Sequence, residues 1–318
     1  HPLSGPTYML AWTTTPWTLP GNVALAVGKD IVYVFAKDKK SADIFVIAKE
    51  CVDVLGNYEI IEELRGEDLV HRDYTYKPLF EIQEFKKSEK VYKIYAADFV
   101  NTEQGTGIVH TAVMYGEDDY KLGKKVGLPT FHTVDETGKF IKTLTYNFAG
   151  KYVKDLETEK QILDFLKEKG NRMFNVESYG PHYPLCWRCD SPLLYYARYG
   201  WWIAMTKLRA QLIANNQKIN WFPPYLKEGR FGEWLREVKD WAISRERYWG
   251  LPLPIWECRS CRHHEIIGSL ADLDKKSFHA LRTVFVMRHG EADHNVNGTT
   301  GPAIPEHDVG NHLTERGR

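Results

Sequence analysis

Residues 105–120 read Gly-Thr-Gly-Ile-Val-His-Thr-Ala-Val-Met-Tyr-Gly-Glu-Asp-Asp-Tyr, and this stretch decides how the chain is interpreted. Gly105 and Gly107 permit positive φ angles or a close approach of the backbone to a bound group. Ile108 and Val109 are β-branched, so they predict a short buried strand with His110 at its end.

After this strand, Gly116 breaks the chain, and three acidic residues at 117–119 load negative charge onto the predicted first turn of a helix. A neutral imidazole and a carboxylate would then face one hollow, which suits a small cationic group such as an α-amino group. Two simpler interpretations stay open. An acidic first turn offsets the helix dipole without any ligand, and a lone histidine after an apolar strand is more often a packed polar residue.

Length and composition set the outer bounds. With 318 residues, the chain is long enough for two or three modules, each with its own core. Its 42 basic and 42 acidic residues cancel, so any nucleic-acid contact must come from local patches. No apolar run approaches the roughly 20 residues of a membrane helix. Residues 1–5 resemble mid-protein sequence and predict no signal peptide.

Four of the five cysteines form two C-x-x-C pairs, Cys186 with Cys189 and Cys258 with Cys261, and Cys51 stands alone. Each pair has the spacing that presents two thiolates to one tetrahedral Zn²⁺. The segment between the pairs is far longer than the roughly 15–20 residues of a compact zinc ribbon, which counts against the pairing. A thioredoxin-like redox role is the weaker alternative. The pattern predicts a zinc site in a reducing compartment, and hence a cytoplasmic protein. The runner-up ligands are His263 and His264.

A second motif lies upstream, at residues 12–22, and reads Trp-Thr-Thr-Thr-Pro-Trp-Thr-Leu-Pro-Gly-Asn. Threonine hydroxyls at a strand end can donate to and accept from a ribose or an ester carbonyl, although a threonine run can also be mere β-favouring filler. Taken in this order, the two motifs resemble the editing-domain signatures of the isoleucyl-tRNA synthetase family. The related valyl and leucyl enzymes carry an arginine within the threonine-rich motif, and this chain has none.

The resemblance implies a role for each motif. The threonines and the asparagine would line the editing pocket and hold the terminal adenosine of tRNA with its amino acid. Asp119 would fix the α-ammonium group, and His110 would form the wall that a larger side chain strikes. Val113 stands where the family usually has proline, which predicts a looser loop between these two residues. The residues implied in catalysis are Thr13, Thr14, Thr15, Asn22, His110 and Asp119, and those implied in substrate binding are Trp12, Trp17, Gly105, Thr106 and Gly107.

Two further matches extend the resemblance to about residue 268. Residues 186–197, Cys-Trp-Arg-Cys-Asp-Ser-Pro-Leu-Leu-Tyr-Tyr-Ala, are similar to a zinc knuckle of the family. Residues 241–254, Trp-Ala-Ile-Ser-Arg-Glu-Arg-Tyr-Trp-Gly-Leu-Pro-Leu-Pro, are similar to the return of the chain into the nucleotide-binding catalytic domain. Tryptophans alternate with basic residues between the cysteine pairs. Such a pattern can stack on bases and pair with phosphates, but a core under a solvated shell is the more common arrangement.

Residues 283–291, Thr-Val-Phe-Val-Met-Arg-His-Gly-Glu, predict an apolar strand followed by Arg288 and His289. This segment resembles the opening of the histidine phosphatase superfamily. There the histidine takes the phosphoryl group and the arginine clamps its oxygens. The family's second histidine, second arginine and acid would lie beyond Arg318, so we expect no phosphatase activity from this segment.

Apolar or alternating runs predict strands at residues 8–12, 23–27, 31–36 and 91–97. Residues 155–169 predict a helix that begins at a capping aspartate and is stopped by the glycine at position 170. Its predicted buried face consists of Ile162, Leu163 and Leu166.

Together these features predict a multidomain chain that combines α+β and α/β parts. We expect a β-barrel-like editing domain at residues 1–181, without its first strand. A zinc-knuckle connection with a partial Rossmann-type catalytic segment would follow at 182–268. A linker at 269–282 and a truncated α/β histidine-phosphatase-like segment at 283–318 would complete it.

The predicted function is hydrolysis of mischarged valyl-tRNA(Ile) by a monomeric fragment of an isoleucyl-tRNA synthetase. The adenylation signatures of the family are missing, so ATP and Mg²⁺ are expected only in a full-length parent that joins isoleucine to tRNA. The partners would be tRNA(Ile) and the valine or isoleucine esters at its aminoacyl end. A non-catalytic tRNA-binding module and a phosphoryl-transfer enzyme are the alternatives.

Overall fold

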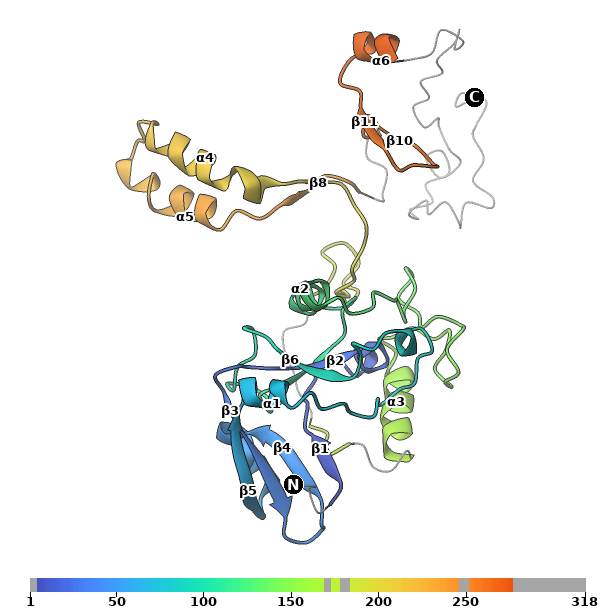
Figure 1. Cartoon of the computed structure of the whole chain (residues 1–318). Coiled ribbons are helices and arrows are strands. Elements are labelled where there is room, and N and C mark those ends of the chain that lie inside the picture. Colours follow the sequence, from blue (N-terminus) through green and yellow to red (C-terminus); the bar gives the residue numbers. More distant parts are fainter. Residues whose placement is uncertain (1–4, 169–172, 178–183, 246–251, 277–318) are drawn as a thin grey trace. The chain divides into compact units, whose positions relative to one another are not determined.

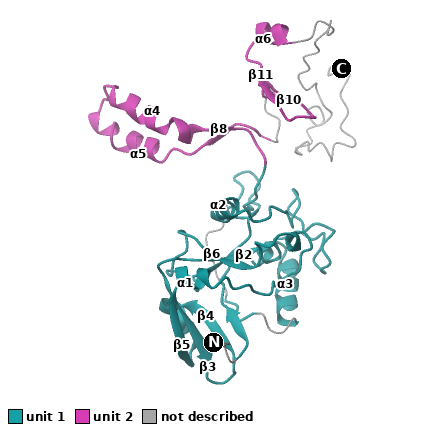
Figure 2. Cartoon of the chain, in the orientation of Figure 1, with its two compact units in different colours: residues 1–198 teal, residues 199–318 magenta. Residues whose placement is uncertain are grey.

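The computed structural model describes residues 5–168, 173–177, 184–245 and 252–276. The chain divides into two compact units, residues 1–198 and 199–318, which Figure 2 colours separately. The sequence placed the corresponding boundary after residue 181. The later boundary assigns the first cysteine pair to the first unit and the second pair to the second unit.

The N-terminal sheet of the first unit has four strands in the order β1-β4-β3-β5 (Figure 1). The strands are β1 (Thr7–Met9), β3 (Val32–Asp38), β4 (Ile44–Ala48) and β5 (Tyr58–Arg65). β1 runs parallel to β4, whereas β3 is antiparallel to both of its neighbours. Aromatic and β-branched residues dominate β3 and β4, and Tyr33, Phe35 and Ile44 are buried in the core that the sheet covers.

The second sheet brings the central motif into the core of the first unit. It contains β2 (Ala24–Val27), β6 (Lys93–Ala96) and β7 (Ile108–Thr111), in the order β6-β2-β7. Every residue of β2 is buried, as expected for an uninterrupted apolar strand with partners on both sides. Leu25 of β2 pairs with His110 of β7. The predicted strand at 108–109 is therefore confirmed, and it includes the histidine itself.

The helices of the first unit are short. They are the 3-10 helices η1 (Pro16–Gly21), η2 (Lys49–Leu55) and η3 (Phe85–Lys87) and the α-helices α1 (Gly66–His71), α2 (Glu117–Val126) and α3 (Leu156–Glu168). The acidic first turn predicted at residue 117 begins α2, which ends at Gly127 with a left-handed φ of 79°. The predicted helix at 155–169 is confirmed as α3. Ile162 and Leu166 are buried on it, whereas Leu163 is only half-buried.

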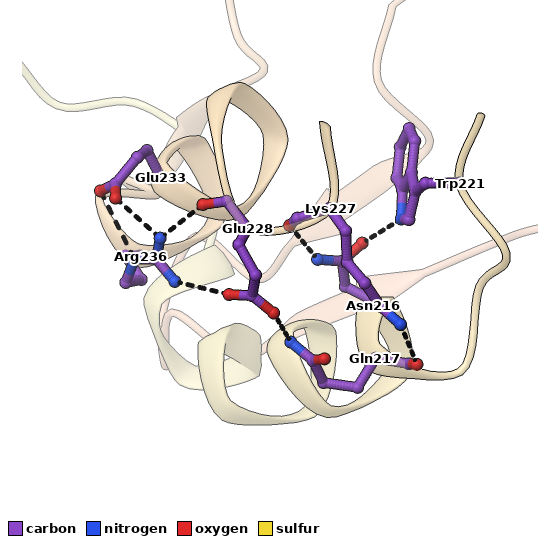
Figure 3. A network of polar contacts seen from close by, with 7 residues as sticks. All are labelled: Asn216, Gln217, Trp221, Lys227, Glu228, Glu233 and Arg236. Atoms are coloured by element: carbon purple, nitrogen blue, oxygen red, sulfur yellow. Dashed lines mark hydrogen bonds and ion pairs between the residues drawn. The ribbon is translucent and has the colours of Figure 1, made fainter. Parts of the chain in front are cut away.

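The second unit is built around a helical hairpin of α4 (Met205–Gln217) and α5 (Arg230–Arg236), connected through η4 (Pro224–Leu226). Figure 3 shows the polar contacts that join its two arms. Asn216 is 2% exposed, and its side chain donates to the Lys227 carbonyl (2.8 Å) and accepts from Trp221 Nε1 (2.7 Å). Arg236 then connects α5 to Glu228 and also pairs with Glu233 within the same helix. Because both ends of the Asn216 amide are used, this residue fixes how the hairpin closes.

The other elements described in the second unit are short. They are the strand pairs β8 (Trp202–Ile203) with β9 (Trp241–Ala242) and β10 (Ile255–Glu257) with β11 (His264–Ile266), and the helix α6 (Leu270–Lys276). Both strand pairs are antiparallel. None of the helices that the structure describes is long and apolar enough to cross a membrane.

Several parts of the predicted architecture differ from what the structure describes. In the described part of the first unit, the strands form two separate sheets, so a closed barrel stays a prediction. The strands described between residues 184 and 276 pair only in antiparallel fashion. A Rossmann-type segment, which needs parallel strands, therefore also stays a prediction. The predicted linker at 269–282 contains α6. The segment at 283–318, with Arg288 and His289, lies outside the described residues.

Candidate active site

His110 lies on β7 with its ring enclosed by protein, and only 9% of the residue is exposed. Its Nε2 atom is 3.0 Å from the hydroxyl of Thr18 on η1. Burial lowers the pKa of His110 to about 4, because the charged imidazolium would lose its hydration. The ring is therefore neutral near pH 7.

The tautomer of His110 follows from the bonds of Thr18. When the Thr18 hydroxyl donates its one proton to the carbonyl of Thr15 (2.8 Å), it accepts a hydrogen bond from the protonated Nε2 of the histidine. His110 Nδ1 is then an unprotonated acceptor. It is buried, and among the described residues it has no hydrogen-bond partner. A buried acceptor of this kind is costly unless a ligand or a water satisfies it.

The threonine run forms a chain of hydroxyls that ends on this histidine. The Thr15 N–H donates to Thr13 Oγ1 (3.1 Å), and the hydroxyls of these two threonines are 3.4 Å apart. The Thr15 hydroxyl lies 3.3 Å from that of Thr18. Thr14 is exposed, and among the described residues its hydroxyl is not part of this chain of contacts. Thr18 was absent from the predicted site residues. The only sequence signal for it is its place in the motif, three residues after Thr15.

Asp119 lies in the first turn of α2, and its Oδ2 atom accepts the backbone N–H of Ala112 (3.2 Å). Burial raises the pKa of Asp119 to about 6, although the bond from Ala112 opposes this shift. A Cβ on Gly116 would come within 2.8 Å of Asp119 Oδ2, so a larger residue there would displace the carboxylate. Ala112 is two residues after His110, so this bond connects the start of α2 to the residues that follow the histidine, and a shared site for the two side chains stays a prediction.

Two other residues implied in the site have their side chains turned into the protein. Asn22 is buried, donates from Nδ2 to the Ala24 carbonyl (3.0 Å) and accepts from the Tyr76 hydroxyl (2.6 Å). Trp17 is buried in the core with its ring edge-on to Tyr115, at a centroid distance of 5.2 Å. Both residues fix the shape of η1 and of the strand after it.

The glycine-rich turn is fitted to neighbouring protein atoms. Gly105 and Gly107 have positive φ angles of 78° and 71°, which favour glycine. A Cβ on Gly105 would meet the Trp12 side chain at 3.0 Å, and one on Gly107 would meet Ala48 at 2.4 Å. The Thr106 carbonyl accepts the Ala48 N–H (3.0 Å). The residue that packs against Gly105, Trp12, is 37% exposed, so part of it is presented to solvent.

The loop between the histidine and the aspartate is tightly packed. Val113, which stands at the position usually held by proline in the resembling family, is only 2% exposed. It packs on α2, where a Cβ on Gly123 would lie 2.6 Å from its methyl group. The Tyr115 N–H donates to the Ala112 carbonyl (2.9 Å) and closes a turn. These contacts show how the loop packs, and its looseness relative to a loop with proline stays a prediction.

The two cysteine pairs share one turn geometry. In each pair, the carbonyl of the first cysteine accepts the N–H of the residue four positions later, at 2.9 Å for both Cys186 and Cys258. The donating residues, Asp190 and Arg262, have positive φ angles of 54° and 60°. In each pair, the N–H of the first cysteine donates to the carbonyl five positions later, at 2.8 Å. Two segments 72 positions apart thus present C-x-x-C on the same turn.

This geometry fits a thiolate-bound metal. The backbone N–H of Cys261, followed by Ser260, lowers the pKa of Cys258 to about 6, which favours the thiolate that a metal requires. Within the described residues, no group of three or more His, Cys, Asp or Glu side chains could hold a metal. A zinc site that uses these cysteines therefore stays a prediction.

Comparison with known proteins identifies the family. The family described as tRNA synthetases class I (I, L, M and V) matches residues 27–291. Isoleucine–tRNA ligases from Clostridium novyi (strain NT) and Clostridium tetani (strain Massachusetts / E88) are 46% and 47% identical over 271 residues. Each alignment covers 85% of this chain and 25% of the relative, so the chain spans about a quarter of the length of these curated relatives.

A solved leucyl-tRNA synthetase editing domain from P. knowlesi is also similar. Its TM-score is 0.40 at 12% identity, covering 51% of this chain and 82% of that one, a likeness too low to decide the fold. The family match itself extends over more than half of the chain. The chain therefore belongs to the class I tRNA synthetases of the isoleucine, leucine, methionine and valine group.

Proposed function

We propose that this chain carries the editing site of an isoleucyl-tRNA synthetase and hydrolyses valyl-tRNA(Ile) to valine and free tRNA. The isoleucine–tRNA ligases among its relatives support the choice of amino acid and tRNA. The observation that carries the proposal is the hydrogen bond that the Ala112 N–H, two residues after the neutral and buried His110 of β7, donates to the carboxylate of Asp119 on α2. In the longer parent protein, ATP and Mg²⁺ would serve the separate joining of isoleucine to tRNA. That protein would act as a monomer in the cytoplasm.

The chemistry explains why such a site is needed. Valine and isoleucine differ by one methylene, and an apolar pocket separates such a pair by only about 1–3 kcal/mol, a general limit for which isoleucyl-tRNA synthetase is itself the standard example. A second site that admits valine and excludes isoleucine removes the resulting errors. A buried, uncharged ring is a suitable wall because its position is fixed and it has no charge to attract water.

Each group has a defined part in this reaction. The carboxylate of Asp119 pairs with the α-ammonium of the amino acid, and His110 limits the length of its side chain. The hydroxyls of Thr13 and Thr15 orient the ester and the ribose. A positioned water adds to the ester carbonyl carbon, the bond to the ribose oxygen breaks, and that oxygen takes up the proton. The enzyme forms no covalent intermediate.

Substitution of Asp119 tests the anchoring role. In Asp119→Ala, valyl-tRNA(Ile) hydrolysis should fall by at least about a hundredfold, because the ammonium loses its partner. Asp118→Ala is the matched control, since Asp118 is its exposed neighbour and pairs with Lys121 at 3.4 Å. Single-turnover deacylation by the full-length protein measures both. If the wild type binds this tRNA without hydrolysing it, the chain is a binding module and the proposal is wrong.

We also propose one structural Zn²⁺ held by Cys186, Cys189, Cys258 and Cys261. The shared turn geometry of the two pairs supports it, as does the chemistry of four thiolates with knuckle spacing. A bound zinc would supply folding free energy and no step of the hydrolysis.

A further inference from the structure

Residues 112–116 form the loop that joins β7 to α2 and positions Asp119. The Ala112 N–H donates to the Asp119 carboxylate (3.2 Å), and the Tyr115 N–H donates back to the Ala112 carbonyl (2.9 Å). Tyr115 is 6% exposed, so its ring is part of the core. Any contact that holds this loop therefore also holds the carboxylate.

Residues 132–134 hold the loop through the side chain of Tyr115. The Tyr115 hydroxyl accepts the backbone N–H groups of Thr133 (2.7 Å) and Val134 (2.9 Å). The Tyr115 hydroxyl also lies 3.0 Å from the hydroxyl of Thr133, within hydrogen-bonding distance. Three bonds on one buried oxygen fix the ring, and with it the middle of the loop.

Residues 196–198 hold both of these segments. The Ala197 N–H donates to the Met114 carbonyl in the middle of the loop (2.8 Å). The Tyr196 ring stacks on His132, with centroids 4.2 Å apart and planes inclined by 13°. The Tyr196 hydroxyl donates to the Val134 carbonyl (3.0 Å). The loop that bonds to the Asp119 carboxylate is thus held by a segment that lies much further along the chain.

We propose that Tyr196 is a positioning residue for hydrolysis: its stack on His132 fixes residues 196–198, and through the Ala197–Met114 bond it fixes the loop that presents Asp119. This inference rests on the proposed function, because it names a further residue on which that reaction depends. The same segment continues past Arg198 into the second unit. A displacement of residues 196–198 would therefore change the loop geometry without touching the substrate.

Three variants of the full-length protein separate this role from a general loss of structure. Tyr196→Ala removes the stack and the hydroxyl, whereas Tyr196→Phe keeps the stack and removes only the hydroxyl. Tyr195→Ala is the matched control, because Tyr195 is 65% exposed. Each variant is measured by single-turnover hydrolysis of valyl-tRNA(Ile) and by backbone amide exchange at Ala112 and Tyr115.

In Tyr196→Ala, we expect hydrolysis to fall at least about tenfold through kcat with little change in KM, since a small misplacement of a reacting group costs this much. Exchange at Ala112 and Tyr115 should become at least about tenfold faster, with β3 and β4 unchanged. Tyr196→Phe should keep most of the rate, and Tyr195→Ala should match the wild type.

The inference would be overturned if Tyr196→Ala hydrolysed valyl-tRNA(Ile) and exchanged the Ala112 and Tyr115 amides at wild-type rates. It would also be overturned if amide exchange in β3 and β4 became faster by the same factor as at Ala112 and Tyr115. If the wild type hydrolyses no valyl-tRNA(Ile), the proposed function fails by itself. Faster exchange confined to residues 112–116 in Tyr196→Ala would still support the positioning role.

Discussion

At the scale of single residues, the candidate site depends on where two protons lie. The Thr18 hydroxyl has one proton and two neighbours, the Thr15 carbonyl and His110 Nε2, so its orientation decides which ring nitrogen of the neutral histidine carries the proton. Asp119 needs to lose its proton to hold an ammonium, and burial delays that loss until about pH 6. Below that pH, the carboxyl would be neutral and the proposed anchoring charge would be lost.

Acidification should change the free energy of unfolding through these residues in opposite directions. The pKa of His110 is lowered from 6.5 to about 4, so between these values the unfolded chain binds more protons and stability falls as the pH falls. The pKa of Asp119 is raised from 3.8 to about 6, so there the folded chain binds more protons and stability rises as the pH falls. In the wild type, the two contributions partly cancel.

Two variants should expose the separate contributions. Between pH 6.5 and pH 4, Asp119→Asn should lose about 1 kcal/mol more unfolding free energy than the wild type, after allowance for partial exposure of the carboxyl. His110→Gln should lose about 2–3 kcal/mol less, because the histidine is almost fully buried. Urea unfolding at both ends of this range measures the difference. Parallel pH profiles for all three proteins would contradict the assigned pKa directions.

At the scale of elements, local signals predicted well and long-range contacts did not. The strand at 108–111 and the acidic start of α2 follow from β-branching and from charge near a helix N-terminus, which act within a few residues. The bond between Thr18 and His110 joins residues 92 positions apart, so no local pattern indicates it. The arrangement of strands in two sheets also depends on pairings such as β1 with β4, which a run of apolar residues does not specify.

The helical hairpin of the second unit offers an element-scale prediction. Asn216→Asp should destabilise α4 and α5 by about 1–3 kcal/mol, because the Lys227 carbonyl would lose its donor and face a buried carboxylate (Figure 3). Asn215→Asp is the control, since Asn215 is exposed. Amide exchange within the two helices measures the change, and equal exchange in both variants would contradict the role given to Asn216.

At the scale of the whole molecule, the cysteine pairs belong to different units but have the same turn. Sequence spacing alone predicted the ligand types, and it argued against their pairing because the intervening segment is long. That argument applies to compact ribbons, in which one short hairpin supplies both pairs. It does not apply where each pair is held by its own turn.

The zinc proposal predicts one metal atom per chain. Elemental analysis of the purified protein should find about one zinc. Cys186→Ser should abolish it and increase amide exchange in residues 184–198. Cys51→Ser should leave it unchanged, because Cys51 instead donates to the Thr102 carbonyl (3.7 Å). Metal-free protein with unchanged exchange would show that the cysteine turns stand without zinc.

The most direct test of the account is the ratio of isoleucyl-tRNA(Ile) to valyl-tRNA(Ile) hydrolysis in His110→Ala, measured beside the wild type and His110→Gln. The wild type should hydrolyse valyl-tRNA(Ile) in strong preference. In His110→Ala, this ratio should rise by about tenfold or more, because a pocket without its wall admits the extra methylene of isoleucine. His110→Gln should stay selective, since it keeps a side chain of similar reach toward Thr18. A His110→Ala protein that is inactive on both esters, or that discriminates as the wild type does, would contradict the role of His110 as the wall of the pocket.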